Sequence, residues 1–283
     1  MGPAMASPGG DDQAMREVPL RSFRRVSVVI PAKNEENNLG WVLRRLPIEV
    51  DEVILVDGNS SDRTIEVALS IRPDTVVVND RIPGKGAALR AGFAAATGDY
   101  IVMLDADGSM DPVEINTFIA ALDAGHDLAK GSRFLADGGT SDISPIRQLG
   151  NVVLLTIANV LFRTRQTDLC YGYAAFRREA IAPLALDARG FEIESQLFLR
   201  AIHNRLSVTE IPSFEAPRIS GTSNLHTFRD GWRVLRSITR EWRRPKIDRR
   251  RVPRREIGMP ETPPLGELVT SAIMGTSIEK TLE

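Results

Sequence analysis

The chain has 283 residues, of which 42% are hydrophobic and 26% are charged, and its formal net charge at pH 7 is −1. This length and composition indicate a globular protein with one large domain, or one domain plus extensions. The balanced charge creates no bulk positive field, so we expect no nucleic-acid partner. Because there is a single cysteine, an internal disulfide and a cysteine-based metal site are excluded, which fits a reducing compartment.

The two ends of the chain carry no pattern of a folded domain. Residues 1–24 are rich in Gly, Pro, Asp and Ala, which predicts a disordered tail, and residues 256–283 predict a flexible one. The N-terminus lacks the basic and apolar regions of a secretory signal. The longest apolar stretch, residues 152–162, is shorter than the roughly 18 to 20 residues that span a bilayer. We therefore expect a cytoplasmic protein, at most peripheral at the inner face of the membrane.

Strands alternate with helices between these tails. The apolar runs predict strands at residues 26–30 (closed by Pro31), 53–56, 76–78 and 100–104. Helices are predicted from residue 35 with Asn34 as its cap, over 62–71, over 87–96, and from 111–112 onward. This alternation predicts an α/β fold, with a mostly parallel sheet covered by helices on both faces. Polar clusters follow each of the four strands, at the edge where such sheets bind ligands.

Two carboxylates, Asp105 and Asp107, follow the fourth predicted strand. An extended backbone sends side chains two residues apart to the same side, so the two acids repel each other unless a cation lies between them. The alternative is one acid capping a turn and the other in solvent. Both ligands are hard oxygens, which favours Mg²⁺ or Mn²⁺ over zinc.

Three motifs carry a resemblance to a known family: Ile30-Pro-Ala-Lys-Asn-Glu-Glu36, Val56-Asp-Gly-Asn-Ser-Ser-Asp62 and Leu104-Asp-Ala-Asp-Gly108. They resemble the family 2 glycosyltransferases of GT-A fold, in particular the dolichyl- and polyprenyl-phosphate mannosyl- and glucosyltransferases. The likeness covers residues 25–228. Beyond the fourth predicted strand it includes the segments 130–134, 190–194 and 218–223. It implies a single Rossmann-like catalytic domain over 25–228, a nucleotide-sugar donor, and inversion at the anomeric carbon.

The resemblance assigns residues to the donor. Pro31, Ala32, Glu35 and Asp57 match family positions that hold the base and ribose, and Asp105 and Asp107 match the metal-binding pair. Many relatives have two consecutive acids where this chain has Asp57-Gly58, so the choice between a GDP-sugar and a UDP-sugar stays open. Lys85, between two glycines, is a candidate for the donor phosphates, and a solvated lysine in a flexible turn is an equal alternative.

The resemblance also implies residues for the acceptor. Arg133 and Arg147 are expected to bind a phosphate monoester, and the alternative is a structural ion pair. Tyr173 is expected to stack on the sugar or acceptor, and Arg218 to act from a loop. A phosphate acceptor needs no base, whereas a hydroxyl acceptor would need one, for which Glu194 or Glu192 is the candidate.

Residues 229–255 are strongly basic. Trp232, Leu235, Ile238 and Trp242 recur at helical spacing within this segment, which predicts a basic amphipathic helix. Such a helix lies on an anionic membrane surface, or it docks its apolar face on the domain with a solvated basic tail. RNA binding is a weaker option, since no nucleic-acid module accompanies the charge.

Together these features predict a metal-dependent inverting hexosyltransferase that uses a donor of the GDP-mannose or UDP-glucose type and a polyprenyl-phosphate acceptor. The first alternative is a soluble family member with a hydroxyl acceptor, whether a sugar, a metabolite or a protein. A sugar-nucleotide pyrophosphorylase is less consistent with the sequence, because the glycine-rich loop that such an enzyme has after its first strand is absent. A non-catalytic binding protein is disfavoured by the intact carboxylate pair.

Overall fold

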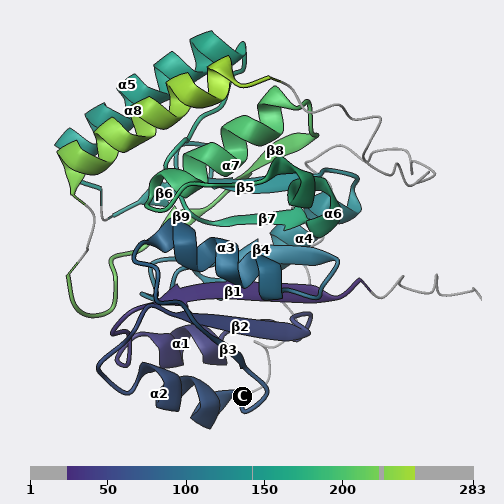
Figure 1. Ribbon diagram of the computed structural model, residues 1–283, viewed down its shortest axis with the longest axis vertical. Helices are drawn as coiled ribbons and strands as arrows, with labels where there is room; N and C mark the ends of the chain where they lie inside the picture. The colour runs from purple at the N-terminus through teal and green to yellow at the C-terminus, as the bar shows by residue number, and fades with distance from the viewer. Residues whose placement is uncertain (1–23, 142, 223–225, 246–283) are drawn as a thin grey trace, which may run out of the picture.

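The computed structural model describes residues 24–141, 143–222 and 226–245. A seven-stranded sheet runs through this part of the chain in the order β3-β2-β1-β4-β7-β5-β8, and the order can be followed in Figure 1. Only β7 runs antiparallel to its neighbours, so the predicted, mostly parallel sheet is confirmed. The strands are β1 (Val26–Ala32), β2 (Glu52–Asp57), β3 (Val76–Asn79), β4 (Tyr100–Met103), β5 (Leu128–Ser132), β7 (Ala174–Arg177) and β8 (Val208–Pro212), with β6 (Gly139–Thr140) and β9 (Phe214–Glu215) paired separately.

Helices cover both faces of the sheet. They are α1 (Leu39–Arg44), α2 (Thr64–Ile71), α3 (Lys85–Ala95), α4 (Ile115–Asp123), α5 (Pro145–Phe162), α6 (Arg178–Ile181), α7 (Glu192–His203) and α8 (Thr227–Arg243), with 3₁₀ turns η1 (Pro112–Glu114) and η2 (Ala182–Leu184). Successive strand residues point to opposite faces, which divides the core in two. Val28 and Ile30 pack in one half with residues of α1, α2 and α4. Val29 packs in the other half with residues of α3 and α7.

Two predicted boundaries differ from the structure. Asn34 has a φ of 57° and does not cap a helix, because its side-chain oxygen accepts from the Ser61 N–H (2.8 Å), and α1 begins only at Leu39. Pro31 lies inside β1 instead of ending it. The pairing of β1 with β4 stops at Val29, so the missing N–H of the proline breaks no hydrogen bond to that strand.

Helix α5 corrects the prediction that no segment is long enough to span a bilayer. The helix starts at Pro145, where the Ser144 hydroxyl accepts from the Arg147 N–H, and it therefore includes residues before the apolar run. Its 18 residues are long and apolar enough to cross a membrane by length and composition alone. All of them except Asn151 and Ala158 are exposed or half-buried, and the helix packs against α8 and α7 (Figure 1).

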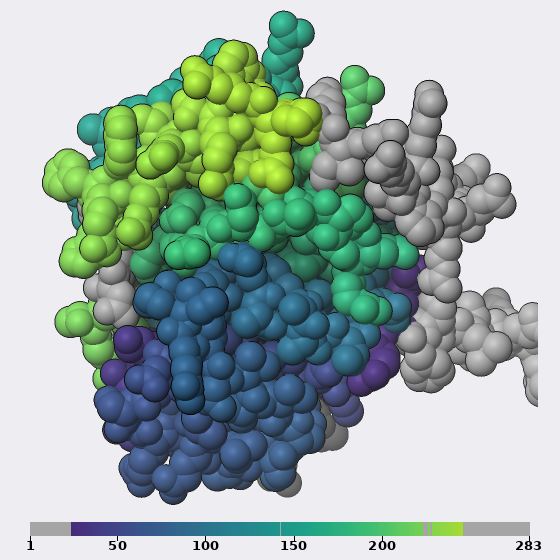
Figure 2. All heavy atoms as spheres, viewed as in Figure 1, coloured from purple at the N-terminus to yellow at the C-terminus, as the bar shows by residue number. Residues whose placement is uncertain are grey.

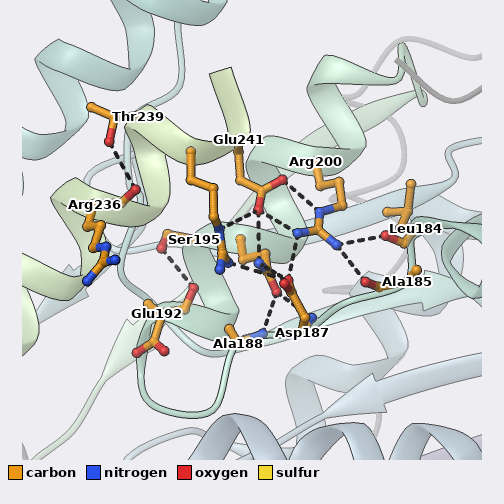
Figure 3. Close-up of polar contacts among 12 residues, drawn as sticks. Leu184, Ala185, Asp187, Ala188, Glu192, Ser195, Arg200, Arg236, Thr239 and Glu241 are labelled. Carbon is orange, nitrogen blue, oxygen red and sulfur yellow. Dashed lines mark hydrogen bonds and ion pairs between the residues drawn. The ribbon is translucent and has the colours of Figure 1, made fainter. Parts of the chain in front are cut away.

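Helix α8 docks on α7, as one of the alternatives left by the sequence predicts. Val234 and Ile238 are buried in the core half shared with α7, and Glu241 pairs with the buried Arg200 of α7 (Figure 3). Trp232 and Trp242, predicted to share a face with Ile238, are 68% and 46% exposed. The docked face therefore differs from the predicted stripe. The predicted tails and residues 246–255 of the basic segment lie outside the described residues.

Candidate active site

The candidate site lies at the carboxyl edge of the parallel strands, where β1, β2 and β4 end. Asp57 is the last residue of β2, and Asp105 follows β4 by two residues. The N-terminus of α3 brings Lys85 to the same place, and the first turn of α7 brings Glu194. The prediction that polar side chains converge at this edge is therefore confirmed for these residues.

Lys85 is the centre of a buried charge cluster. Its Nζ lies 2.6 Å from Asp105 Oδ1 and 2.6 Å from Glu194 Oε1, and its side chain is 12% exposed. Burial acts to lower the pKa of the Lys85 ammonium, but the charges of Asp105 and Glu194 outweigh it and raise that pKa. The alternative of a solvated lysine is therefore wrong, and Lys85 stays charged at neutral pH.

Glycines create the space for this cluster. A Cβ at Gly172 would lie 2.6 Å from Glu194 Oε1 and 3.0 Å from Lys85 Nζ. Gly84 has a φ of 122°, and a Cβ there would lie 2.1 Å from the backbone oxygen of Arg189. The glycines beside Lys85 thus fit the chain tightly against the segment that precedes α7, and the expected flexible turn is not observed.

Asp107 lies next to Asp105 and is held by its own turn. Its Oδ1 accepts hydrogen bonds from the Ser109 N–H (3.0 Å) and the Ser109 hydroxyl (2.7 Å). The backbone oxygen of Asp107 accepts from the N–H of Ile219 (3.1 Å). This bond fastens the loop that carries Arg218 over the carboxylate pair.

The two carboxylates suit a hard divalent cation. Burial raises the pKa of the Asp105 carboxyl, Lys85 opposes that rise, and the negative charge of Asp107 adds to it. The two acids are thus close enough to repel each other, as expected of two carboxylates that bind one cation. The described residues contain no group of three metal-ligating side chains. Asp105 and Asp107 could therefore hold Mg²⁺ or Mn²⁺ only with further oxygens from a donor diphosphate or water.

Asp57 has the features expected of a ligand-binding carboxylate. Its side chain is buried, and its Oδ2 accepts from the Ser60 N–H (3.0 Å). Its Oδ1 is buried without a hydrogen-bond partner. An unpaired buried carboxylate oxygen is costly, so a donor group such as a ribose hydroxyl or a base N–H would stabilise it. Pro31 and Ala32 lie directly opposite in register with Val56 and Asp57.

Glu35 and Arg218 form an ion pair with each other. Arg218 Nη2 is 2.9 Å from Glu35 Oε1, and the Asn38 side chain donates to the other Glu35 oxygen. The backbone oxygen of Ser220 accepts from both Arg218 and Asn38. The sequence placed Glu35 with the donor and Arg218 with the acceptor, whereas the structure joins them in one ion pair.

Arg133 is in a different environment from the one expected of an exposed phosphate ligand. Its side chain is 3% exposed, and it pairs with Asp168 (2.7 Å) and Glu215 (2.9 Å). The structure therefore favours the alternative of a structural ion pair for this residue. Arg147 lies in the first turn of α5 and is half-buried. Glu215 was missed in the sequence, because a single glutamate in a short strand carries no distinguishing pattern.

Tyr173 contradicts its predicted role. Its side chain is fully buried, its ring stacks on Phe118 with centroids 4.5 Å apart, and its hydroxyl donates to the Asp111 backbone oxygen (2.9 Å). An aromatic residue with both ring and hydroxyl used inside the core has no free face for a sugar or acceptor. Tyr173 is therefore a core residue.

Comparisons with known proteins agree with this geometry. Residues 27–184 match the family model described as glycosyl transferase family 2. The chain is 36% identical over 240 residues to the polyprenol monophosphomannose synthase of Mycolicibacterium smegmatis, covering 78% of this chain and 89% of that protein. It is 31% identical over 211 residues to the dolichol-phosphate mannosyltransferase of Pyrococcus furiosus, covering 71% of this chain but only 59% of that one.

A solved structure has the same fold. Glucosyl-3-phosphoglycerate synthase from Mycobacterium tuberculosis, in complex with Mn²⁺, UDP and glucosyl-3-phosphoglycerate, superimposes with a TM-score of 0.62. The match covers 79% of this chain and 81% of that one, at 24% sequence identity. The predicted GT-A fold is therefore confirmed.

Proposed function

Since the chain belongs to glycosyl transferase family 2, and is thus a glycosyltransferase, we propose that it transfers a hexose from a nucleotide diphosphate sugar to a polyprenyl phosphate. The named activities of the Mycolicibacterium and Pyrococcus relatives support this acceptor class. The observation that carries the proposal is the carboxylate pair Asp105 and Asp107, at the same sheet edge as the unpaired oxygen of Asp57.

Each part of the site has a task in this reaction. A bound Mg²⁺ or Mn²⁺, held by Asp105 and Asp107, would neutralise the charge that grows on the leaving diphosphate. Asp57 accepts hydrogen bonds from the ribose or base and so fixes the donor's orientation. Lys85 supplies a positive charge next to the diphosphate.

The acceptor half of the proposal concerns the arginines. A phosphate monoester is already anionic at neutral pH, so it attacks the anomeric carbon without a base. Arg147 and Arg218 are the arginines we assign to this phosphate, because guanidinium groups bind it bidentately, and Arg218 would exchange its ion pair with Glu35 for the phosphate. Arg133 positions the surrounding chain through its ion pairs with Asp168 and Glu215.

A hydroxyl acceptor remains the second candidate because of Glu194. Its carboxylate is buried within the site, and burial raises its pKa while Lys85 acts against that rise. A carboxylate with a raised pKa serves as a general base near neutral pH. If the acceptor is a hydroxyl compound, the E194Q variant should lose transfer. If the acceptor is a phosphate, E194Q should keep it.

The test of the proposed function is a transfer assay with a panel of donors and acceptors. GDP-mannose and UDP-glucose are each incubated with the enzyme, Mn²⁺, and either a polyprenyl phosphate or the matching polyprenol. We expect one donor to give a lipid-linked hexose with the phosphate and none with the alcohol. Donor hydrolysis that the lipid phosphate does not divert would contradict the acceptor and favour a hydroxyl compound.

We also propose that the protein is peripheral at an anionic membrane, at its inner face, through α5 and α8. Five apolar side chains of α5 are exposed and recur at helical spacing: Ile146, Leu149, Val152, Val153 and Val160. Beside it, α8 exposes Phe228, Trp232 and Trp242. The two helices lie next to each other at one end of the molecule (Figure 1), and α8 forms much of the surface there (Figure 2).

Charge and packing specify how the surface would meet the bilayer. Exposed arginines on α8 flank the tryptophans, at positions 229, 233, 236, 240 and 243, and each basic residue near an anionic surface contributes about 1 kcal/mol. Helix α5 buries Asn151 and Ala158 on its inner side. A helix whose inner side is packed on the domain lies in the interface and does not span it.

The membrane proposal predicts that the L149D/V153D variant stops sedimenting with lipid vesicles. Both side chains are exposed, so aspartates there do not disturb packing but oppose entry into the interface. The matched control is I48D, since Ile48 is 95% exposed away from these helices. Vesicles with anionic lipid should bind the wild type more tightly than zwitterionic vesicles, and less at high salt. Unchanged sedimentation of L149D/V153D would contradict this surface.

A further inference from the structure

Both oxygens of the proposed metal ligand Asp105 are occupied by a lysine. Lys85 Nζ lies 2.6 Å from Asp105 Oδ1 and 2.8 Å from Oδ2, and the same nitrogen contacts Glu194. Gly172 leaves room for the contact between Lys85 and Glu194, and Gly84 and Gly86 let the start of α3 pack against the backbone of residues 188–190. A divalent cation that binds Asp105 would therefore have to share these oxygens with the Lys85 ammonium.

We propose that Lys85 is an internal counter-ion that competes with the metal for Asp105, so that metal and donor diphosphate bind together and not separately. Two cations on one carboxylate repel each other, which weakens metal binding to the donor-free enzyme. A diphosphate brings the negative charge that lets both cations stay, with Lys85 turning from Asp105 to the phosphates. Metal binding and diphosphate binding then strengthen each other by the same factor.

Glu194 gives this exchange a second anchor. When the metal takes Asp105, the ammonium of Lys85 still has the Glu194 carboxylate 2.6 Å away. Lys85 therefore does not lose all its charge partners in the buried site, which would be strongly unfavourable. Removal of the Lys85 charge should strengthen metal binding, and removal of the Glu194 charge should weaken it. Damage to the fold alone does not produce this pattern.

The test measures Mn²⁺ affinity of donor-free enzyme, from the signal of free Mn²⁺ in electron paramagnetic resonance. For K85M, which leaves Asp105 and Glu194 unneutralised, we expect Mn²⁺ to bind about 10-fold tighter or more. For E194Q we expect weaker binding, because the ammonium then has Asp105 alone. The matched control is R90M, which removes a charge from the exposed Arg90 of the same helix and should leave affinity nearly unchanged.

A second measurement tests the exchange itself. UDP and GDP are titrated into wild type and K85M with and without Mn²⁺, and the factor by which the metal tightens nucleotide binding is compared. We expect this factor to fall about 10-fold in K85M. An unchanged factor, or donor-free Mn²⁺ affinity in K85M that equals or falls below that of wild type, would overturn the proposal.

The outcomes separate this inference from the function on which it rests. If K85M does not fold, as judged by circular dichroism, E194Q decides, and Mn²⁺ affinity equal to or above wild type overturns the counter-ion role. If wild type binds no Mn²⁺ even with UDP and GDP, the proposed metal site fails, and the inference with it. If wild type and folded K85M bind Mn²⁺ equally, the metal site stands and only the role of Lys85 fails.

Discussion

The D105N variant is expected to lose at least ~10²- to 10³-fold in kcat/KM for hexose transfer, the cost of removing one group that stabilises transition-state charge. Asparagine keeps the size of the side chain but lacks the negative charge that holds a divalent cation. It also leaves the buried Lys85 ammonium, 2.6 Å away, with one carboxylate fewer. D107N should show a loss of the same order, since both acids are assigned to one ion.

The assay for this prediction follows transfer as a function of Mn²⁺ concentration. The matched control is D74N, because Asp74 is exposed and pairs with the neighbouring Arg72. Its kcat/KM should equal that of wild type within experimental error. Near-normal turnover in both D105N and D107N, in folded protein, would mean that the carboxylate pair does not hold the catalytic metal.

The E241A variant is expected to lower the free energy of unfolding by about 3 to 5 kcal/mol. Arg200 and Glu241 are each 1% exposed, and Arg200 Nε lies 2.8 Å from Glu241 Oε2 (Figure 3). Removing the carboxylate leaves a buried guanidinium whose remaining partners are two backbone oxygens and the half-exposed Asp187. The Gln196 side chain loses its bond to Glu241 as well.

Urea unfolding of E241A, with R240Q as the control, measures this effect. Arg240 is 46% exposed, and its contacts with Asp187 (3.4 Å) and Glu241 (3.5 Å) are long, so R240Q should change stability by less than about 1 kcal/mol. The double variant R200M/E241L removes both charges and should recover most of the loss. A loss below about 1 kcal/mol in E241A would show that the pair does not hold α8 on α7.

The parts of the fold that could be predicted from the sequence are those set by local pattern. The strands at residues 26–30, 53–56 and 100–104 are buried apolar runs, and their order with the helices predicts a parallel sheet. Asp105 and Asp107 were found because they directly follow such a run. A short motif next to a strand can be recognised from the sequence without any knowledge of tertiary contacts.

The misses in the candidate site depend on contacts between residues far apart in the chain. Lys85 and Glu194 are 109 residues apart, so nothing local indicates that they pair. The same holds for Arg133 and Glu215, whose pairing buries an arginine that the resemblance assigned to the acceptor phosphate. Tyr173 was placed with the acceptor because an aromatic side chain can either stack on a sugar or pack in the core. Its stacking on Phe118 identifies it as a core residue.

The start of α5 was missed for a different reason. Ser144 and Pro145 are a local start signal, a capping residue followed by proline in the first turn, but the prediction followed the apolar run, which begins only at residue 152. Tertiary packing decides which side of α8 is covered, so that Ile238 is buried and Trp232 is exposed. Amphipathic spacing predicts that a helix has two faces, but it does not predict which side its neighbour covers.

The measurement that tests the central claim most directly is the stoichiometry of transfer with a radiolabelled donor, polyprenyl phosphate and Mn²⁺. The account predicts one lipid-linked hexose for each nucleoside diphosphate released, no product after EDTA, and recovery when Mn²⁺ is restored in excess. Full lipid-linked product in the presence of EDTA, or nucleotide release without any lipid-linked sugar, would contradict it.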